Sequence, residues 1–229
     1  MMKKVRKRLA GSERKQIIAL TAAKLFARLG VSGTTTKQIS EAAGVSEGLL
    51  FKYFPTKDDL TAAALDACRQ NVIPAKIAEA VARPPSTAAL VQLVVALAEH
   101  VEFTTKPVER EDRDTINRML YRSLCEDGKF ARIMLQDIEK RTVAYTANCL
   151  EAARASGDID PLADDPAILL SWFGHFLAWG VMAGQLPPRL PMLDKYDRRT
   201  QLNAMVRFRL RGFGLTGKAL RRHLDLSES

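Results

Sequence analysis

Apolar residues recur at helical spacing along most of the chain. Residues 12–30 carry one such stripe at i, i+4, i+7, i+8 and i+11, formed by Ile18, Ala22, Leu25, Phe26 and Leu29. Comparable stripes predict further helices at about 56–72, 86–103, 128–156, 167–184 and 194–213. No segment stands out with the alternating pattern of a strand, and no repeat of 20–50 residues recurs. The pattern therefore predicts an all-α protein.

The stretch 35–60 predicts two short helices joined by a tight turn, followed at once by a third. Thr35 can cap the first helix, with Gln38 three residues on completing a capping box. Gly44 suits the left-handed backbone that ends that helix, and Ser46 can cap the second. This order of cap, helix, glycine turn, cap and helix is typical of a helix-turn-helix motif.

The basic charge is concentrated at the beginning of the chain. The whole chain of 229 residues has a formal net charge of +9. Residues 1–58 hold 12 Lys and Arg against 4 Asp and Glu, a net of +8, and the remaining 171 residues have a net of +1. Such a distribution is expected where a protein neutralises phosphates, although a basic tail that only aids solubility gives the same count.

Several residue types around this motif fall at fixed offsets: Gly44-Val45-Ser46, Gly48, Phe51-x-Tyr53-Phe54 and Lys57. This combination resembles the DNA-binding signature of the TetR-like (tetracycline-repressor) family of transcriptional regulators. Leu49, Phe51 and Tyr53 differ from the residue types that are common at these positions in the family, which bears on the base preference.

The resemblance implies a division into a head and a body. We expect a basic flexible arm (1–11), a three-helix DNA-binding head (12–60), a helical ligand-binding and dimerisation body (61–217) and a polar tail (218–229). In the head, the second helix of the motif would enter the major groove. The residues expected to contact DNA are Thr36, Lys37, Gly48, Leu49, Phe51, Lys52, Tyr53 and Lys57. Packing within the head is the alternative interpretation for Leu49 and Phe51.

An aromatic stripe in the body is a candidate wall for an effector pocket. Trp172, His175, Phe176 and Trp179 lie on one helical face with a single titratable group. Other side chains that could complete an apolar cavity are Phe103, Met119, Tyr121, Met134 and Tyr145. A core or a dimer interface is the alternative interpretation of this stripe.

The segment 167–184 is apolar all round and just long enough to suggest a membrane span. Acidic residues and a Pro-Pro break flank it, and it contains His175 and three glycines. A helix that is apolar all round can be buried on every side, and the resemblance implies that this one lies between the body and a partner subunit. The helices at 167–184 and 194–213 are the candidates for the seam of a homodimer.

Catalysis is not indicated by any motif. The three histidines and three cysteines are far apart and lack metal-ligand spacing, and we find no phosphate-binding glycine loop. We interpret the mixed charges at 109–114 as a solvated helix face. The expectation is a cytoplasmic protein without catalytic residues, metal or cofactor.

The resemblance implies a ligand-responsive repressor that binds a pseudo-palindromic DNA operator as a dimer and is released by a small, largely apolar effector. Two other interpretations remain open. The protein could activate transcription, or its helical body could bind a protein partner instead of a small ligand.

Overall fold

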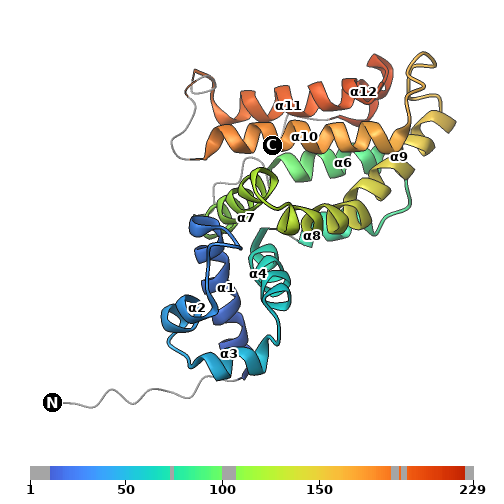
Figure 1. The fold of residues 1–229 in the computed structure, drawn as a ribbon. Helices are drawn as coiled ribbons and strands as arrows, with labels where there is room; N and C mark the ends of the chain where they lie inside the picture. Colours follow the sequence, from blue (N-terminus) through green and yellow to red (C-terminus); the bar gives the residue numbers. More distant parts are fainter. Residues whose placement is uncertain (1–10, 73–74, 100–106, 187–190, 192–194, 225–229) are drawn as a thin grey trace.

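The computed structural model describes residues 11–72, 75–99, 107–186, 191 and 195–224. These parts of the chain form helices and contain no strand, with one isolated bridge between Ile159 and Leu215. The all-α prediction is confirmed. Figure 1 shows a small N-terminal head below a larger helical body. The basic arm lies mostly outside the described residues.

Three helices form the head, α1 (Gly11–Leu29), α2 (Thr36–Ala43) and α3 (Glu47–Tyr53), and α4 (Lys57–Val72) begins in the head and continues into the body. The predicted capping box at the start of α2 is present, because Gln38 N donates to Thr35 Oγ1 at 3.2 Å and Thr35 N donates to Gln38 Oε1 at 2.9 Å. Gly44 ends α2 with φ of 66°, a conformation that costs glycine little. Local signals therefore set both ends of α2.

The body contains the remaining helices: α5 (Ala75–Val81), α6 (Thr87–Leu97), α7 (Pro107–Cys125), α8 (Lys129–Ile138), α9 (Ala144–Ala155), α10 (Ala167–Gln185), α11 (Arg198–Gly212) and α12 (Gly217–His223). A π-helical segment, η2 (Glu139–Val143), joins α8 to α9. The long helix predicted at 128–156 is thus present as three consecutive helical segments, of which the middle one is π-helical. Figure 1 shows α10 and α11 side by side at the top of the body, above α6 and α7.

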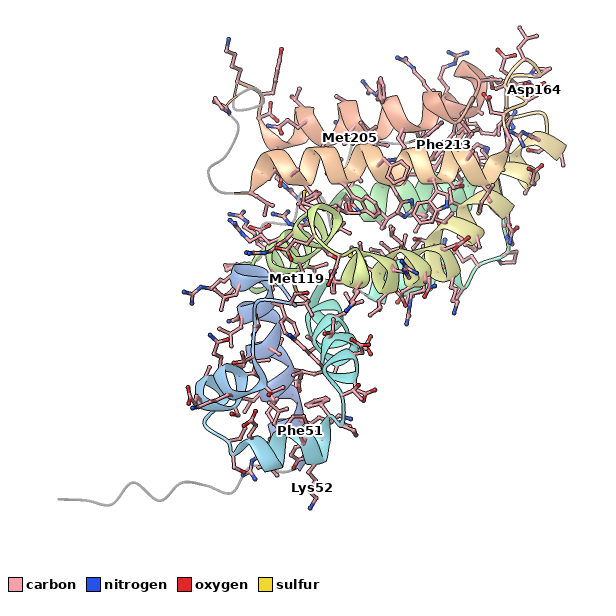
Figure 2. All side chains as sticks on the ribbon, viewed as in Figure 1. Phe51, Lys52, Met119, Asp164, Met205 and Phe213 are labelled. Atoms are coloured by element: carbon pink, nitrogen blue, oxygen red, sulfur yellow. The ribbon has the colours of Figure 1, made fainter. Side chains whose placement is uncertain are left out.

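Head and body share one hydrophobic core. Phe26 of α1 and Leu60 of α4 belong to the same buried cluster as Leu120 of α7 and Trp179 of α10. Figure 2 shows Met119, a buried member of this cluster, at the junction between the head and the body. A second cluster centres on α6, α9 and α11. The shared core fixes the head directly on the body.

Helix α10 is the one helix among the described residues that is long and apolar enough to cross a membrane. That test considers only length and composition. Of the most apolar 18 residues of α10, 39% are buried inside the protein. Ala167, Leu170 and Ala178 belong to the buried clusters. A core helix passes the same test, so this observation alone is weak support for a membrane span.

Two expectations for polar segments hold only in part. In the run interpreted as a solvated face, Arg110 and Glu111 are exposed, but Arg113 is only 3% exposed, because α7 turns this side toward the centre of the body. The segment after 217, expected to be a tail, contains α12: Thr216 caps it and its Ala219 is buried. Asp158 helps to hold α12 in place through an ion pair with Arg222 at 3.1 Å.

Candidate nucleic-acid interface and ligand cavity

Helix α3 is held at both ends and presents one side to solvent. Ser46 Oγ accepts a hydrogen bond from Leu49 N at 3.2 Å and so caps the helix. Thr36 Oγ1 donates to Glu47 Oε1 at 2.5 Å, which ties the first turn of α2 to the first turn of α3. Leu50 is buried beneath the helix. These contacts fix the orientation of α3 on the head.

The outer side of α3 carries Gly48, Phe51 and Lys52, all exposed, and Phe51 has 44% of its surface accessible. Figure 2 shows Lys52 at the far end of the head, directed away from the protein. A Cβ added at Gly48 would meet no atom within 4 Å. A macromolecule can therefore approach the outer side of α3 closely enough to contact its backbone at Gly48.

The other residues expected to contact DNA occupy more varied positions. Lys37 is exposed on α2, whereas Leu49 and Tyr53 are half-buried. Tyr53 packs against Phe54 with ring centroids 6.5 Å apart. The structure thus brings together an exposed group on α3 and places Leu49 and Tyr53 partly within the head.

Lys57 lies close to the body as well as to α3. Partial burial, and next the positive charge of Lys129 in α8, lower the pKa of its ammonium group. Asp127 acts in the opposite direction. Lys57 therefore lies within electrostatic reach of the turn between α7 and α8, a proximity that its sequence position did not indicate.

A cavity of about 130 Å³ lies in the centre of the body, lined by residues from α4, α6, α7, α8, η2, α9, α10 and α11. Its apolar wall includes Ile116, Met134, Trp179 and Phe213. Leu65 contributes from α4, the helix that follows α3 through a short loop. The cavity is thus linked to the candidate nucleic-acid interface by one continuous helix.

A polar group on one side of the cavity is organised around His175. Its Nδ1 lies 3.0 Å from the carbonyl oxygen of Ser171, and its Nε2 lies 3.0 Å from Thr142 Oγ1. Burial lowers the pKa of His175 to about 4, with a smaller contribution from the nearby charge of Arg209, although the hydrogen bond to Ser171 acts in the opposite direction. The imidazole is therefore neutral at pH 7.

Two arginines that the periodic pattern did not assign to the cavity also line it. They are Arg113 on α7 and Arg209 on α11, which are 3% and 5% exposed. Arg209 is flanked by Arg207 and Arg211, which both point to solvent. The alternation of these three arginines excludes a common helical face but does not identify which one is buried.

Only part of the expected effector site is assembled at the cavity. Met134, His175 and Trp179 line it. Tyr121 instead donates to the carbonyl oxygen of Trp179 at 2.5 Å, and Tyr145 donates to that of Ala80 at 2.8 Å. Burial raises the pKa of both phenols to about 12, so both remain protonated donors.

The remaining expected members lie elsewhere or are not described. Met119 is buried at the junction between head and body. Trp172 and Phe176 stack on each other with centroids 5.9 Å apart and do not line the cavity. Phe103 lies outside the described residues.

Exposed apolar side chains cover the outer face of α10 and extend to α11. Phe173 and Phe176 are both more than half exposed, and Ile168 and Leu169 are each exposed by more than 40%. Phe208 on the neighbouring α11 is 66% exposed. Large exposed apolar side chains of this kind are typical of a protein–protein contact.

Comparison with known proteins places these features in a family. Residues 18–64 match the family described as bacterial regulatory proteins, tetR family. The HTH-type transcriptional regulator HbdR of Aromatoleum sp. (strain CIB) is 30% identical over 150 residues, which cover 66% of this chain and 62% of HbdR. The chain thus spans less than two thirds of that relative.

Solved structures share the fold over nearly their whole length. A tetR-family regulatory protein from Rhodococcus RHA1 aligns with a TM-score of 0.64 at 22% identity, covering 89% of this chain and 98% of that one. NalD of Pseudomonas aeruginosa, the secondary repressor of the MexAB-OprM multidrug efflux pump, aligns at 0.60 with 20% identity, covering 89% and 97%. At these identities the likeness shows the fold. The head, residues 18–64, is thus that of the tetR family of bacterial regulatory proteins, and the described helices have the fold of solved tetR-family proteins.

Proposed function

We propose that the protein is a ligand-responsive transcriptional repressor that binds a pseudo-palindromic DNA operator as a homodimer. The observation that carries this proposal is the outer side of α3, where Gly48, Phe51 and Lys52 are exposed on a helix fixed by caps at both ends. A short recognition helix of this kind enters the major groove with its N-terminal residues at the base edges. Proteins of the TetR family act by binding DNA rather than by catalysis.

In this proposal, residues 12–60 read DNA and residues 61–217 bind the effector and the second subunit. Phe51 and Leu49 would contact apolar base edges, such as a thymine methyl group. Thr36, Lys37, Lys52, Tyr53 and Lys57 would contact bases or phosphates. The concentration of basic charge in the head supports this assignment. The place of action would be the cytoplasm, where a bacterial operator lies.

The outer face of α10 and α11 supports the homodimer. One head reads too few base pairs for useful specificity, and a two-fold pair of heads doubles the contacts. Burying Phe173, Phe176 and Phe208 against a second copy would remove large apolar surfaces from water. The outer face of α10 and α11 is therefore the proposed dimer contact.

Helix α4 supports the coupling between effector and operator. Leu65 lines the cavity, and Lys57 begins the same helix just after α3. An effector that prefers another packing around Leu65 would shift α4 and change the separation of the two heads. Only a difference in affinity for the two arrangements can drive this shift.

The experiment is selection of tight binders from a random duplex pool by the full-length protein, with the mass of the complex measured by light scattering. The proposal predicts a palindromic consensus bound by two chains. Selected duplexes that share no consensus sequence would contradict it. If binding to the selected palindrome raised transcription of a reporter gene, the protein would instead be an activator. A pull-down that captured a protein bound at the α10–α11 face would instead identify a protein partner.

A further inference from the structure

A carboxylate lies beside the exposed side of α3. Glu47 is the first residue of this helix, one helical turn before Phe51, and its side chain is exposed. Figure 2 shows Phe51 and Lys52 at the end of the head that is far from the body. The phosphates of any duplex that approaches this side repel a negative charge at Glu47. This repulsion is offset where the carboxylate meets a hydrogen-bond donor on the DNA.

Helix α2 holds the side chain of Glu47. Thr36 Oγ1, in the first turn of α2, donates to Glu47 Oε1 at 2.5 Å. A hydroxyl group has one proton to donate, and an ionised carboxylate only accepts. The Thr36 hydroxyl group therefore cannot donate to Glu47 and to a phosphate oxygen at the same time. In this arrangement it orients the carboxylate.

Both helices that make this contact have firmly capped beginnings. Thr35 and Gln38 form the capping box of α2, and Ser46 Oγ accepts from Leu49 N at the start of α3. A side chain that is already oriented loses less entropy when it binds a partner. The two oxygens of a carboxylate offer about four acceptor sites, of which Thr36 fills one. Glu47 is therefore an oriented acceptor with capacity for further donors.

The edges of the bases in the major groove decide which base such an acceptor fits. Guanine presents the acceptors O6 and N7, and thymine presents the acceptor O4 beside its methyl group. Adenine presents a donor, its N6 amino group, beside the acceptor N7, a pair that suits an amide side chain. Cytosine presents its N4 amino group as a donor. Cytosine is therefore the base whose edge best complements a carboxylate.

We propose that Glu47 determines part of the operator sequence by accepting a hydrogen bond from the N4 amino group of one cytosine in each half-site, and that Thr36 positions it. The residues at the beginning of a recognition helix are the ones that reach base edges. The inference rests on the proposed function, since it requires α3 to enter the major groove. It adds Glu47 to the residues that contact DNA and gives the hydroxyl group of Thr36 a positioning role.

The test uses the operator obtained by selection, with each base pair of both half-sites replaced in turn by the other three. Competition binding by the full-length wild type should reveal one position in each half-site where cytosine is preferred about fivefold or more over every other base. In Glu47→Gln this preference should disappear or move to adenine, because an amide can bind N6 and N7 of adenine together. Identical base preferences in the two proteins, or a wild type without such a position, would overturn the inference.

Glu41→Gln is the matched control for the loss of charge. Glu41 is exposed on α2, and its replacement removes the same charge from the head. Both substitutions should raise the affinity for a scrambled duplex, because each removes a group that the phosphates repel. Only Glu47→Gln should change the preference for cytosine. An equal change in Glu41→Gln would show an effect of charge alone and would overturn the inference.

Thr36→Val tests the positioning role. Valine has nearly the shape of threonine but no hydroxyl group, so Glu47 would lose its hydrogen bond from α2. The preference for cytosine should fall at least twofold at the Glu47 position, with the preferences at other positions unchanged. A loss of affinity that is equal for all duplexes would instead indicate a direct phosphate contact by Thr36 and would overturn its positioning role.

Failure of this inference is distinguishable from failure of the proposed function. A selection that yields no consensus would contradict DNA recognition by α3 and the role of Glu47 together. A palindromic consensus whose base preferences do not change in Glu47→Gln would overturn the role of Glu47 alone.

Discussion

Gly48 offers a substitution that separates DNA binding from folding. No atom lies within 4 Å of a Cβ added there, and the residue is exposed on α3. Gly48→Leu should therefore leave the free energy of unfolding unchanged or raise it by about 1 kcal/mol, because glycine is a poor helix former. It should lower operator affinity at least 100-fold, since the side chain would occupy the space of a base edge. Fluorescence anisotropy with a labelled operator duplex measures this loss.

Ala78→Leu provides the control for the Gly48 variant. Ala78 is exposed on α5, remote from α3, so the same added bulk should leave operator affinity as in the wild type. If Gly48→Leu bound the operator normally, α3 would not be the recognition helix.

His175 gives the folded protein a defined dependence on pH. Burial lowers its pKa from 6.5 to about 4, so between these values the unfolded chain binds a proton that the folded chain does not. The free energy of unfolding must then fall as the pH drops from 6.5 toward 4, and this contribution is fully present above pH 6.5. His175→Gln removes the titrating group and retains an amide that can hydrogen-bond to Thr142.

Urea unfolding at pH 7 and pH 5 measures the effect. The loss of stability between the two pH values should be smaller in His175→Gln by about 1–2 kcal/mol, allowing for solvent screening at the partly exposed ring. Carboxylates whose pKa values are lowered, such as those of Asp127 and Asp158, titrate at lower pH in both proteins and do not affect the comparison. An identical loss in the two proteins would show that His175 is not buried as described.

The outer face of α10 provides the prediction for a helix. Phe173→Asp places a charge in the middle of the proposed dimer contact, where it would be buried without a partner. Sedimentation equilibrium should show a dimer for the wild type and at least a 100-fold weaker association for the variant. Leu162→Asp is the control, because Leu162 is 90% exposed in a loop and should not affect association. A dimer of unchanged strength in Phe173→Asp would exclude this face.

Helix ends were predictable from the sequence where the signals are local. The capping box at Thr35, the left-handed turn at Gly44 and the cap at Ser46 each depend on residues within a few positions, and all three are present. The buried arginines were not predictable. Whether Arg113 points inward depends on how α7 packs against helices far away in the sequence. The mixed charges around Arg113 do not predict that packing.

The expected effector site shows the same difference between information from nearby residues and information from residues far apart in the sequence. The stripe on α10 correctly identified His175 and Trp179 as neighbours on one face, since helical spacing fixes that relation. It could not separate the cavity from the exposed side, where Phe176 lies. The aromatic ring and hydroxyl group of Tyr145 favour a place at the cavity, but the hydroxyl group donates to the carbonyl oxygen of Ala80 in α5 instead.

The junction between head and body makes the whole molecule suited to coupling two sites. One buried core extends from α1 and α4 to α7 and α10. Arg122 Nη1 also donates to the carbonyl oxygen of Arg28 at 2.6 Å, and Ser32 Oγ donates to Asp127 Oδ2 at 2.8 Å. We therefore expect a repacking of α4 or α7 around the cavity to move the head as well, because both helices contribute to the shared core.

The decisive measurement is the ratio of affinities of the full-length protein for its selected palindrome and for a scrambled duplex of the same composition, at 50 and 200 mM salt. A dimeric sequence reader should favour the palindrome by a factor of about 10³ or more. Both affinities should fall as salt rises, because phosphate contacts release counterions, while the preference for the palindrome persists. A ratio near one at both salt concentrations would mean that the +8 charge of residues 1–58 attracts DNA without reading it, and would contradict the assignment of α3 as a recognition helix.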